Sequence, residues 1–279
     1  MQKNYRENYL RPYAAKSINS EGRIYNEPEN NIRSPFQRDR DRIIHSSSFR
    51  RLKHKTQVFV NTEADHYRTR LTHSMEVSQI ARTLARALGL NEDLSETLSL
   101  SHDLGHTPFG HAGEVALRNC MNNYGGFDHN IQTLRIVTLI EKKYYKFDGL
   151  NLTIETLDGL IKHNGPVRNL TTFKKILGKD LFGNKIIFNT FPSLEAQVAS
   201  ISDDIAYNNH DLEDGLRAGL FTIKRIASIP YISKIVNKHI INIKNFRREI
   251  IISQIIRDLI NLMVVDVINT ANRNLKLCR

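Results

Sequence analysis

The segment 101–114, which reads SHDLGHTPFGHAGE, concentrates side chains that can do chemistry. Its histidines and acids stand among glycines and a proline, which is more typical of a site than of a core. The adjacent pair His102-Asp103 offers one nitrogen and one oxygen ligand, a mixed set that suits Zn, Mn, Fe or Mg rather than a thiolate-bound metal. An isolated pair of this kind would more often be a core histidine beside a helix-end aspartate, so the surrounding sequence decides.

A helix that ends just before this loop would hold the pair in place. Asn91 can cap the start of that helix, and two acidic residues follow in its first turn, where negative charge favours the positive end of the helix dipole. Gly105 is the expected end. The spacing therefore predicts a helix whose last turn carries His102 and Asp103, followed by a loop that can gather ligand-binding side chains.

Several segments beyond this one carry a family resemblance. HDLGHTPFGHAGE, with RLTHS upstream and DDIAY downstream, resembles the HD-domain deoxynucleoside triphosphate triphosphohydrolases, the bacterial dGTPase-like family. The resemblance runs in collinear order over 35–220 and includes SFRRLKHKTQVF and GGFDHNIQTLRIV. It implies a mainly α fold, an HD-type helical bundle with its metal site between helices.

The resemblance also implies a set of metal ligands. They are His73, His102, Asp103 and Asp203, holding a divalent ion such as Mg, Mn or another transition metal. Thr72 is expected to cap the helix that carries His73. Asp203 stands opposite an apolar stripe of its own helix, on a face less polar than solvent exposure requires, so we expect that helix to be buried on both sides.

A second set of residues is expected to bind substrate. Arg51 lies in a basic cluster that could meet phosphates, although a solvated helix face would have the same composition. The resemblance favours binding, and it implies that Gln57 lies against the sugar, where its amide can meet a 3′-hydroxyl. The other substrate contacts that it implies are Arg70, His106, Tyr207 and Asp211.

Proton transfer is expected from the residues that follow the loop. His111 and Glu114 are three residues apart, so on one helical turn the carboxylate can orient the imidazole as in a base–orienter pair. We therefore predict that His111 protonates the leaving 5′-oxygen, with helix capping beside Gly110 as the alternative. His129 lies near the active site in relatives and is a further catalytic candidate, although it could simply belong to a helix start capped by Asp128.

Composition and patterning limit the class of protein. The chain has 279 residues, of which 40% are hydrophobic and 25% charged, as in a globular protein. Two distant cysteines suggest a reducing compartment, so we expect a cytoplasmic location. No signal peptide is recognisable, and charges interrupt the apolar run 249–268, which favours a buried helix over a membrane span.

We expect three parts along the chain. Residues 1–42 should form an extended N-terminal segment, 43–220 the HD-type phosphohydrolase core, and 221–279 a helical C-terminal extension that is shorter than in relatives. Within the core, the glycine-containing stretch 168–191 is expected to be a loop or a hairpin.

The expected activity is metal-dependent hydrolysis of dGTP, or of dNTPs generally, to a deoxynucleoside and inorganic triphosphate. Another HD-domain phosphomonoesterase or phosphodiesterase is one alternative. A catalytically weak nucleotide or single-stranded DNA binding protein is another. The net charge of +11 fits a polyanionic partner, either single-stranded DNA or an activator nucleotide, although compositional bias towards lysine explains part of it. We also expect a homo-oligomer.

Overall fold

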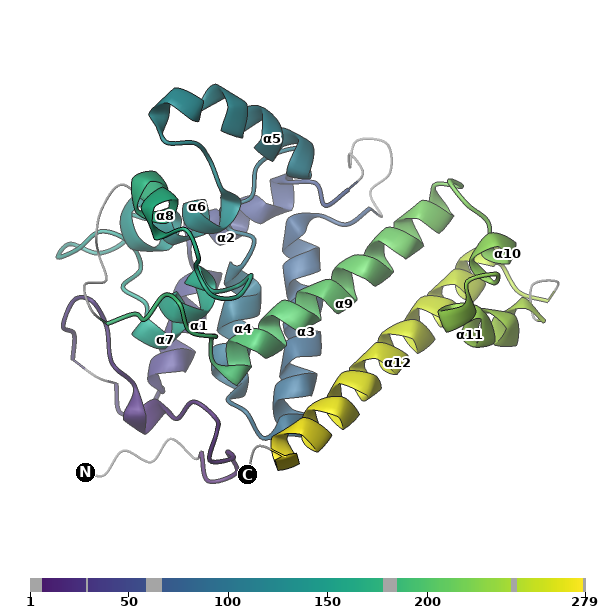
Figure 1. Ribbon diagram of the computed structural model, residues 1–279, viewed down its shortest axis with the longest axis horizontal. Coiled ribbons are helices and arrows are strands. Elements are labelled where there is room, and N and C mark those ends of the chain that lie inside the picture. Colours follow the sequence, from purple (N-terminus) through teal and green to yellow (C-terminus); the bar gives the residue numbers. More distant parts are fainter. Residues whose placement is uncertain (1–6, 29, 59–66, 178–184, 242–244, 278–279) are drawn as a thin grey trace. The chain divides into compact units, whose positions relative to one another are not determined.

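Helices form nearly all the regular structure of this protein in the computed structural model, which describes residues 7–28, 30–58, 67–177, 185–241 and 245–277 (Figure 1). Strand pairing in those ranges is limited to isolated bridges, such as that between Thr56 and Thr69. The mainly α-helical fold expected from the sequence is confirmed.

The chain divides into two compact units, residues 1–203 and 204–279, and the boundary falls within helix α9 (Leu194–Arg217). The longer helices of the first unit are α1 (Pro35–Ile44), α2 (Ser47–Arg51), α3 (Arg70–Leu88), α4 (Glu92–Ser101), α5 (Gly110–Cys120), α6 (His129–Arg135), α7 (Ile154–Ile161) and α8 (Leu170–Leu177). Single turns η1 (Ser17–Asn19), η2 (Leu52–His54) and η3 (Asn122–Tyr124) are 3-10, and η4 (Ile136–Ile140) is a π-helical turn after α6.

Helix α4 is central in the first unit, where it contacts α1, α3 and α7 (Figure 1). Phe36 and Ile43 of α1, Leu94 and Leu98 of α4 and Leu157 of α7 belong to one core cluster and are almost fully buried. Burying each such side chain contributes roughly 1.5–3 kcal/mol. The C-terminal end of α4 is therefore held firmly, and His102 follows it directly.

Side chains close in sequence cap several helices, but α4 ends at Ser101 rather than at the predicted Gly105, so that His102 is its C-cap and Asp103 lies just beyond it. The side chain of Asn91 accepts a hydrogen bond from Leu94 N at 3.2 Å and caps α4. Asp128 and Thr153 cap α6 and α7 in the same way. Gly89 ends α3 in the left-handed conformation, with a φ of 69° that favours glycine.

Helix α3 begins earlier than expected. Thr69, not Thr72, is its N-cap, and Thr72 completes a capping box as the third helical residue. Thr72 cannot be the cap because Thr69 already accepts its backbone N–H. The earlier start places Arg70 in the first turn, three residues before His73, where both side chains can face the same side of the helix.

Three other expectations need correction. The N-terminal segment is not extended through residue 42, because a capping box at Ser34 and a proline at the first helical position start α1 at Pro35. The stretch 168–191 contains α8 in its first half, where the amphipathic pattern favours a helix; residues 178–184, with both glycines, lie outside the described residues. The apolar run 249–268 lies in α12 (Arg248–Leu277), but the buried residues of that helix end at Leu259.

The second unit has a separate core. Helices α10 (Ile223–Ile226), α11 (Pro230–Ile240) and α12 pack around Leu216, Val236 and Ile255. Asn209 of α9 donates to the Met263 sulfur, which ties α9 to α12 within this unit. No helix in the described part of the chain combines the length and apolar character that crossing a membrane requires.

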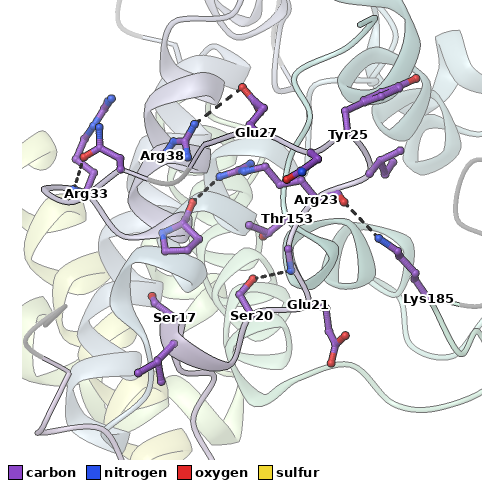
Figure 2. Close-up of a pocket in the computed structure, with 16 residues that line it drawn as sticks. Ser17, Ser20, Glu21, Arg23, Tyr25, Glu27, Arg33, Arg38, Thr153 and Lys185 are labelled. Carbon is purple, nitrogen blue, oxygen red and sulfur yellow. Dashed lines mark hydrogen bonds and ion pairs between the residues drawn. The ribbon is translucent and has the colours of Figure 1, made fainter. Parts of the chain in front are cut away.

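A cavity of about 450 Å³ lies where the N-terminal segment meets α1 (Figure 2). Its basic lining residues have partners within the fold. Arg23 pairs with the buried carboxylate of Asp39, Arg38 lies 3.9 Å from Glu27, and Lys185 donates to the Arg23 carbonyl. These contacts help to hold the segment against α1, so the basic side chains of this cavity have a role in stabilising the fold.

Candidate functional site

Three side chains from separate helical segments meet beside the end of α4. Asp203 Oδ1 lies 2.9 Å from His73 Nε2 of α3 and 3.5 Å from His102 Nε2. The ligand atoms of the three residues all lie within 4.8 Å of one another. Both histidines are buried, and Asp203 is 25% exposed, so the group opens to solvent on the carboxylate side. Two imidazoles and a carboxylate at this spacing can hold a divalent metal ion.

The tautomer of His102 indicates how this group would be used. Its Nδ1 lies 2.6 Å from the Ser99 carbonyl oxygen, so Nδ1–H is assigned as the donor. In the neutral ring Nε2 then carries the lone pair, and it is buried without a hydrogen-bond partner among the described residues. A backbone carbonyl holding the far nitrogen of an otherwise unpaired histidine is the usual arrangement around a metal-binding imidazole. The residues therefore fit a divalent metal.

Asp103 lies beside this group, with its two oxygens in different surroundings. Oδ1 is 3.6 Å from His102 Nε2, and Oδ2 accepts a hydrogen bond from Arg70 at 2.7 Å. The Arg70 Nε has no partner among the described residues, although the side chain is buried. Arg70 therefore holds Asp103 with one nitrogen and keeps another donor for a ligand.

The charged groups of this centre shift one another's pKa values. Burial lowers the pKa of His102, but the carboxylates of Asp103 and Asp203 outweigh it and raise that pKa to about 9. Burial raises the pKa values of Asp103 and Asp203, but nearby histidines, and Arg70 beside Asp103, hold both far below the ordinary range. The two carboxylates stay ionised at neutral pH, and a metal ion would compete with the proton on His102.

A second group of titratable residues lies on the loop side. Glu114 of α5 is buried and accepts a hydrogen bond from His129 Nδ1 at 3.0 Å, whereas His111 Nδ1 is 3.6 Å away. The base–orienter contact is thus made with His129, fifteen residues along the chain, because α6 brings that ring against α5. His111 is 75% exposed. The His106 ring lies beside both of these imidazoles, with its centroid 4.8 Å from that of His129 and 5.3 Å from that of His111.

His106 differs from its neighbours in protonation. Burial lowers its pKa to about 4, and the positive charge of Arg70 adds to that effect. The ring is therefore neutral at pH 7, able to accept or donate one hydrogen bond but not to supply a proton as an imidazolium.

Comparisons with known proteins agree with this geometry. Residues 70–208 match the HD domain family. The chain is 64% identical to a deoxyguanosinetriphosphate triphosphohydrolase-like protein of Pelagibacter ubique (strain HTCC1062), over 88% of this chain and 66% of the relative. It is 53% identical to a protein of the same name from Parvibaculum lavamentivorans, over 95% of this chain and 68% of the relative. This chain belongs to the deoxyguanosinetriphosphate triphosphohydrolase-like HD-domain proteins. It spans about two thirds of the length of these relatives.

The remaining expected site residues of this HD-domain protein lie at different distances from the loop. Gln57 is close to it, because a Cβ on Gly110 would lie 3.8 Å from the Gln57 carbonyl oxygen and 3.7 Å from Arg70. Its side-chain Oε1 is buried without a partner among the described residues. Arg51 is exposed at the end of α2. Tyr207 and Asp211 belong to the second unit, and their contacts with substrate remain a prediction.

Two further residues lie near the centre: His163, which was not singled out in the sequence, and Lys55, which belongs to the same basic cluster as Arg51. His163, just after α7, has its Nε2 3.5 Å from Asp203 Oδ2 and its ring stacked on His102. Lys55 donates to the Leu104 carbonyl, and burial lowers its pKa to about 8. Neither stands in the segment that carries the ligand pair, so only their packing reveals them.

Proposed function

We propose that this chain hydrolyses deoxynucleoside triphosphates, dGTP or dNTPs generally, to a deoxynucleoside and inorganic triphosphate. The observation that carries the proposal is the buried Nε2 of His102, which has no hydrogen-bond partner in the described part of the chain and lies 3.5 Å from Asp203, in a chain of the HD-domain family. The printed names of its relatives supply the substrate class. The metal would be held by His73, His102 and Asp203, with Asp103 beside them as the fourth ligand.

When bound, the divalent ion would lower the pKa of a coordinated water and neutralise charge on the α-phosphate. A water oxygen bonds to the α-phosphorus while the bond from that phosphorus to the 5′-oxygen breaks. Arg70 suits the phosphate, since its Nε is free of partners in the described structure while another nitrogen is tied to Asp103. His106, being neutral, can donate one hydrogen bond to a phosphate oxygen without adding charge.

The leaving 5′-oxygen must take up a proton, and His111 is the residue to which we assign its delivery. His106 is unsuited, because a pKa of about 4 leaves it without the proton at pH 7. His129 has its Nδ1 on the buried carboxylate of Glu114. His111 is exposed, close to the same carboxylate, and able to regain a proton from solvent after each turnover. Glu114 and His129, which are hydrogen-bonded to each other, then keep the structure around His111 in place.

Selection of the sugar is assigned to Gln57. A buried amide oxygen without a partner is costly, and a 3′-hydroxyl would satisfy it. Arg51, exposed and positively charged, is assigned to the outer phosphates, and Tyr207 and Asp211 to the nucleoside. An activator nucleotide or single-stranded DNA as a further partner, assembly into a homo-oligomer, and a cytoplasmic location belong to the same proposal.

The product analysis is the decisive experiment. Purified protein is incubated with each common dNTP and Mg²⁺ or Mn²⁺ in ¹⁸O-labelled water, and products are resolved by chromatography and mass spectrometry. We expect deoxynucleoside and triphosphate, with the label in the triphosphate, because water attacks phosphorus.

Other outcomes would identify other functions. Release of orthophosphate or pyrophosphate would indicate another HD-type phosphohydrolase. Tight nucleotide or single-stranded DNA binding without turnover, in protein shown to contain metal, would indicate a binding protein.

A further inference from the structure

His163 occupies a position against the metal centre that the proposed reaction does not use. It follows α7 in a turn closed by a hydrogen bond from Gly165 N to the Lys162 carbonyl at 2.8 Å. The Lys162 side chain is buried and anchored on Asp158 at 2.6 Å. The His163 side chain is only 13% exposed. The turn is therefore fixed on one side by an ion pair, and the imidazole is directed inward.

Close packing of α7 brings His163 to this place. Gly159 stands four residues earlier in the chain, and a Cβ there would lie 2.6 Å from Leu98 and 3.1 Å from Ala196. Leu98 belongs to α4, the helix that leads to His102, and Ala196 to the part of α9 that leads to Asp203. The absence of a side chain at Gly159 lets α7 approach both helices that present the metal-binding residues.

The two oxygens of Asp203 face different partners. Oδ1 is the atom nearest the ligand nitrogens of His73 and His102, at 2.9 and 3.5 Å. Oδ2 is turned to His163 Nε2, at 3.5 Å. The His163 ring also stacks on the His102 ring, with centroids 5.5 Å apart and planes 26° from parallel. One imidazole thus contacts two of the three residues of the metal-binding group.

We propose that His163 is a positioning residue of the metal centre. Its Nε2–H holds Asp203 Oδ2, so that Oδ1 stays directed at the ion, and its ring supports the plane of His102. Hydrogen bonds to the outer oxygen of a ligating carboxylate orient the ligand, and losing them typically costs about 10–100-fold in metal affinity. The proposal rests on the metal site of the proposed function but not on its substrate.

The test compares two variants that separate the hydrogen bond from the ring. His163→Phe keeps a stacked ring and loses the donor, whereas His163→Gln keeps an N–H donor and loses the ring. Mn²⁺ affinity is measured without nucleotide, by calorimetry and by the electron paramagnetic resonance signal of free Mn²⁺, with far-UV circular dichroism to verify folding. We expect His163→Phe to bind Mn²⁺ about 10–100-fold more weakly, and His163→Gln to recover most of that loss.

The chain offers a matched control. His239 of α11 is also buried and pairs with an aspartate, Asp258, at 3.0 Å, but within the second unit. His239→Phe should leave Mn²⁺ affinity unchanged, which separates a specific effect from the general loss of a His–Asp pair.

Three other outcomes would overturn the assignment. Parent-like Mn²⁺ affinity in His163→Phe would exclude a positioning role. Complete loss of binding in both His163 variants, as in Asp203→Ala, would make His163 a direct ligand instead. Normal affinity with a reduced kcat would make it a substrate contact. Mn²⁺ binding by the parent without dNTP turnover would refute the proposed function and leave this inference standing.

Discussion

Gly105 offers a sharp test of how the loop and α6 are joined, because it lies between the His102-Asp103 pair and His106. An added Cβ at Gly105 would lie 2.3 Å from the His129 carbonyl oxygen and 2.3 Å from Thr133 N, both backbone atoms of α6. The contact is reinforced by a hydrogen bond from Gly105 N to Thr133 Oγ1 at 2.9 Å. Glycine is required here by close approach, since backbone atoms cannot rotate away as a side chain would.

The size of the effect of Gly105→Ala follows from this geometry. Ordinary contact needs about 1 Å more room, so the loop and α6 must separate by about that distance, and His129 moves with α6. Overpacking of this kind costs roughly 1–3 kcal/mol of the free energy of unfolding. A displacement of about 1 Å in catalytic groups can cost about 10²-fold in rate. We therefore expect kcat for dNTP hydrolysis to fall about 100-fold, with Mn²⁺ affinity changed much less.

Urea unfolding, calorimetric Mn²⁺ titration and steady-state kinetics measure the three quantities. Gly22→Ala is the control, because Gly22 has a φ of +77° but no atom of the described residues lies within 4 Å of an added Cβ. It should lose about 1–2 kcal/mol from left-handed strain and keep the parent kcat. A Gly105→Ala protein with parent kcat and stability within about 0.5 kcal/mol would refute the close-approach argument.

Four further predictions concern single residues of the site. Asp203→Ala and His73→Ala should each lose bound metal in elemental analysis, since removing one ligand leaves the ion poorly held; unchanged occupancy in both would discard the ligand assignment. Gln57→Ala should reduce the preference for deoxy over dideoxy substrates, measured as the ratio of kcat/KM values, because its amide is the predicted partner of the 3′-hydroxyl; an unchanged ratio would remove Gln57 from the sugar pocket. His111→Ala should bind Mn²⁺ and dNTP normally while kcat falls about 10²–10⁴-fold, and turnover at the parent rate would assign the proton to another histidine. His106 has its pKa lowered from 6.5 to about 4 in the folded state, so the unfolded chain binds more protons between those pH values. Urea unfolding at several pH values measures this effect in metal-free protein. As pH falls from 6.5 to 4, the free energy of unfolding should decrease more steeply for the parent than for His106→Asn. Equal pH dependence in the two proteins would contradict a neutral buried imidazole.

The helix ends show which features can be predicted from local sequence. Asn91, Asp128 and Thr153 are caps in the structure because a cap depends on hydrogen bonds within three residues. The same locality explains the error at α3, where two threonines three residues apart both suit the position. Helix α8 was missed because the glycines that follow it were weighed above its apolar pattern.

For the site, too, sequence indicated some features and not others. The kinds of ligand and their order along the chain were readable in the segment 101–114 and its resemblance to the HD-domain family, since donor chemistry belongs to the residue itself. The partner of Glu114 was not readable. A spacing of three residues favoured His111, but α6 brings His129 closer, at 3.0 Å against 3.6 Å.

His163 is the clearest example of a residue whose contacts the sequence did not predict, because it is distant along the chain from both Asp203 and His102 and yet contacts both. Sequence alone indicated most of the helices, several of their caps and the supply of nitrogen and oxygen ligands, which follow from interactions within a few residues. Tertiary structure decided which atoms meet. Those contacts depend on close approaches such as that of Gly159 to Leu98 and of Gly105 to α6, and such distances are set by the packing of whole helices.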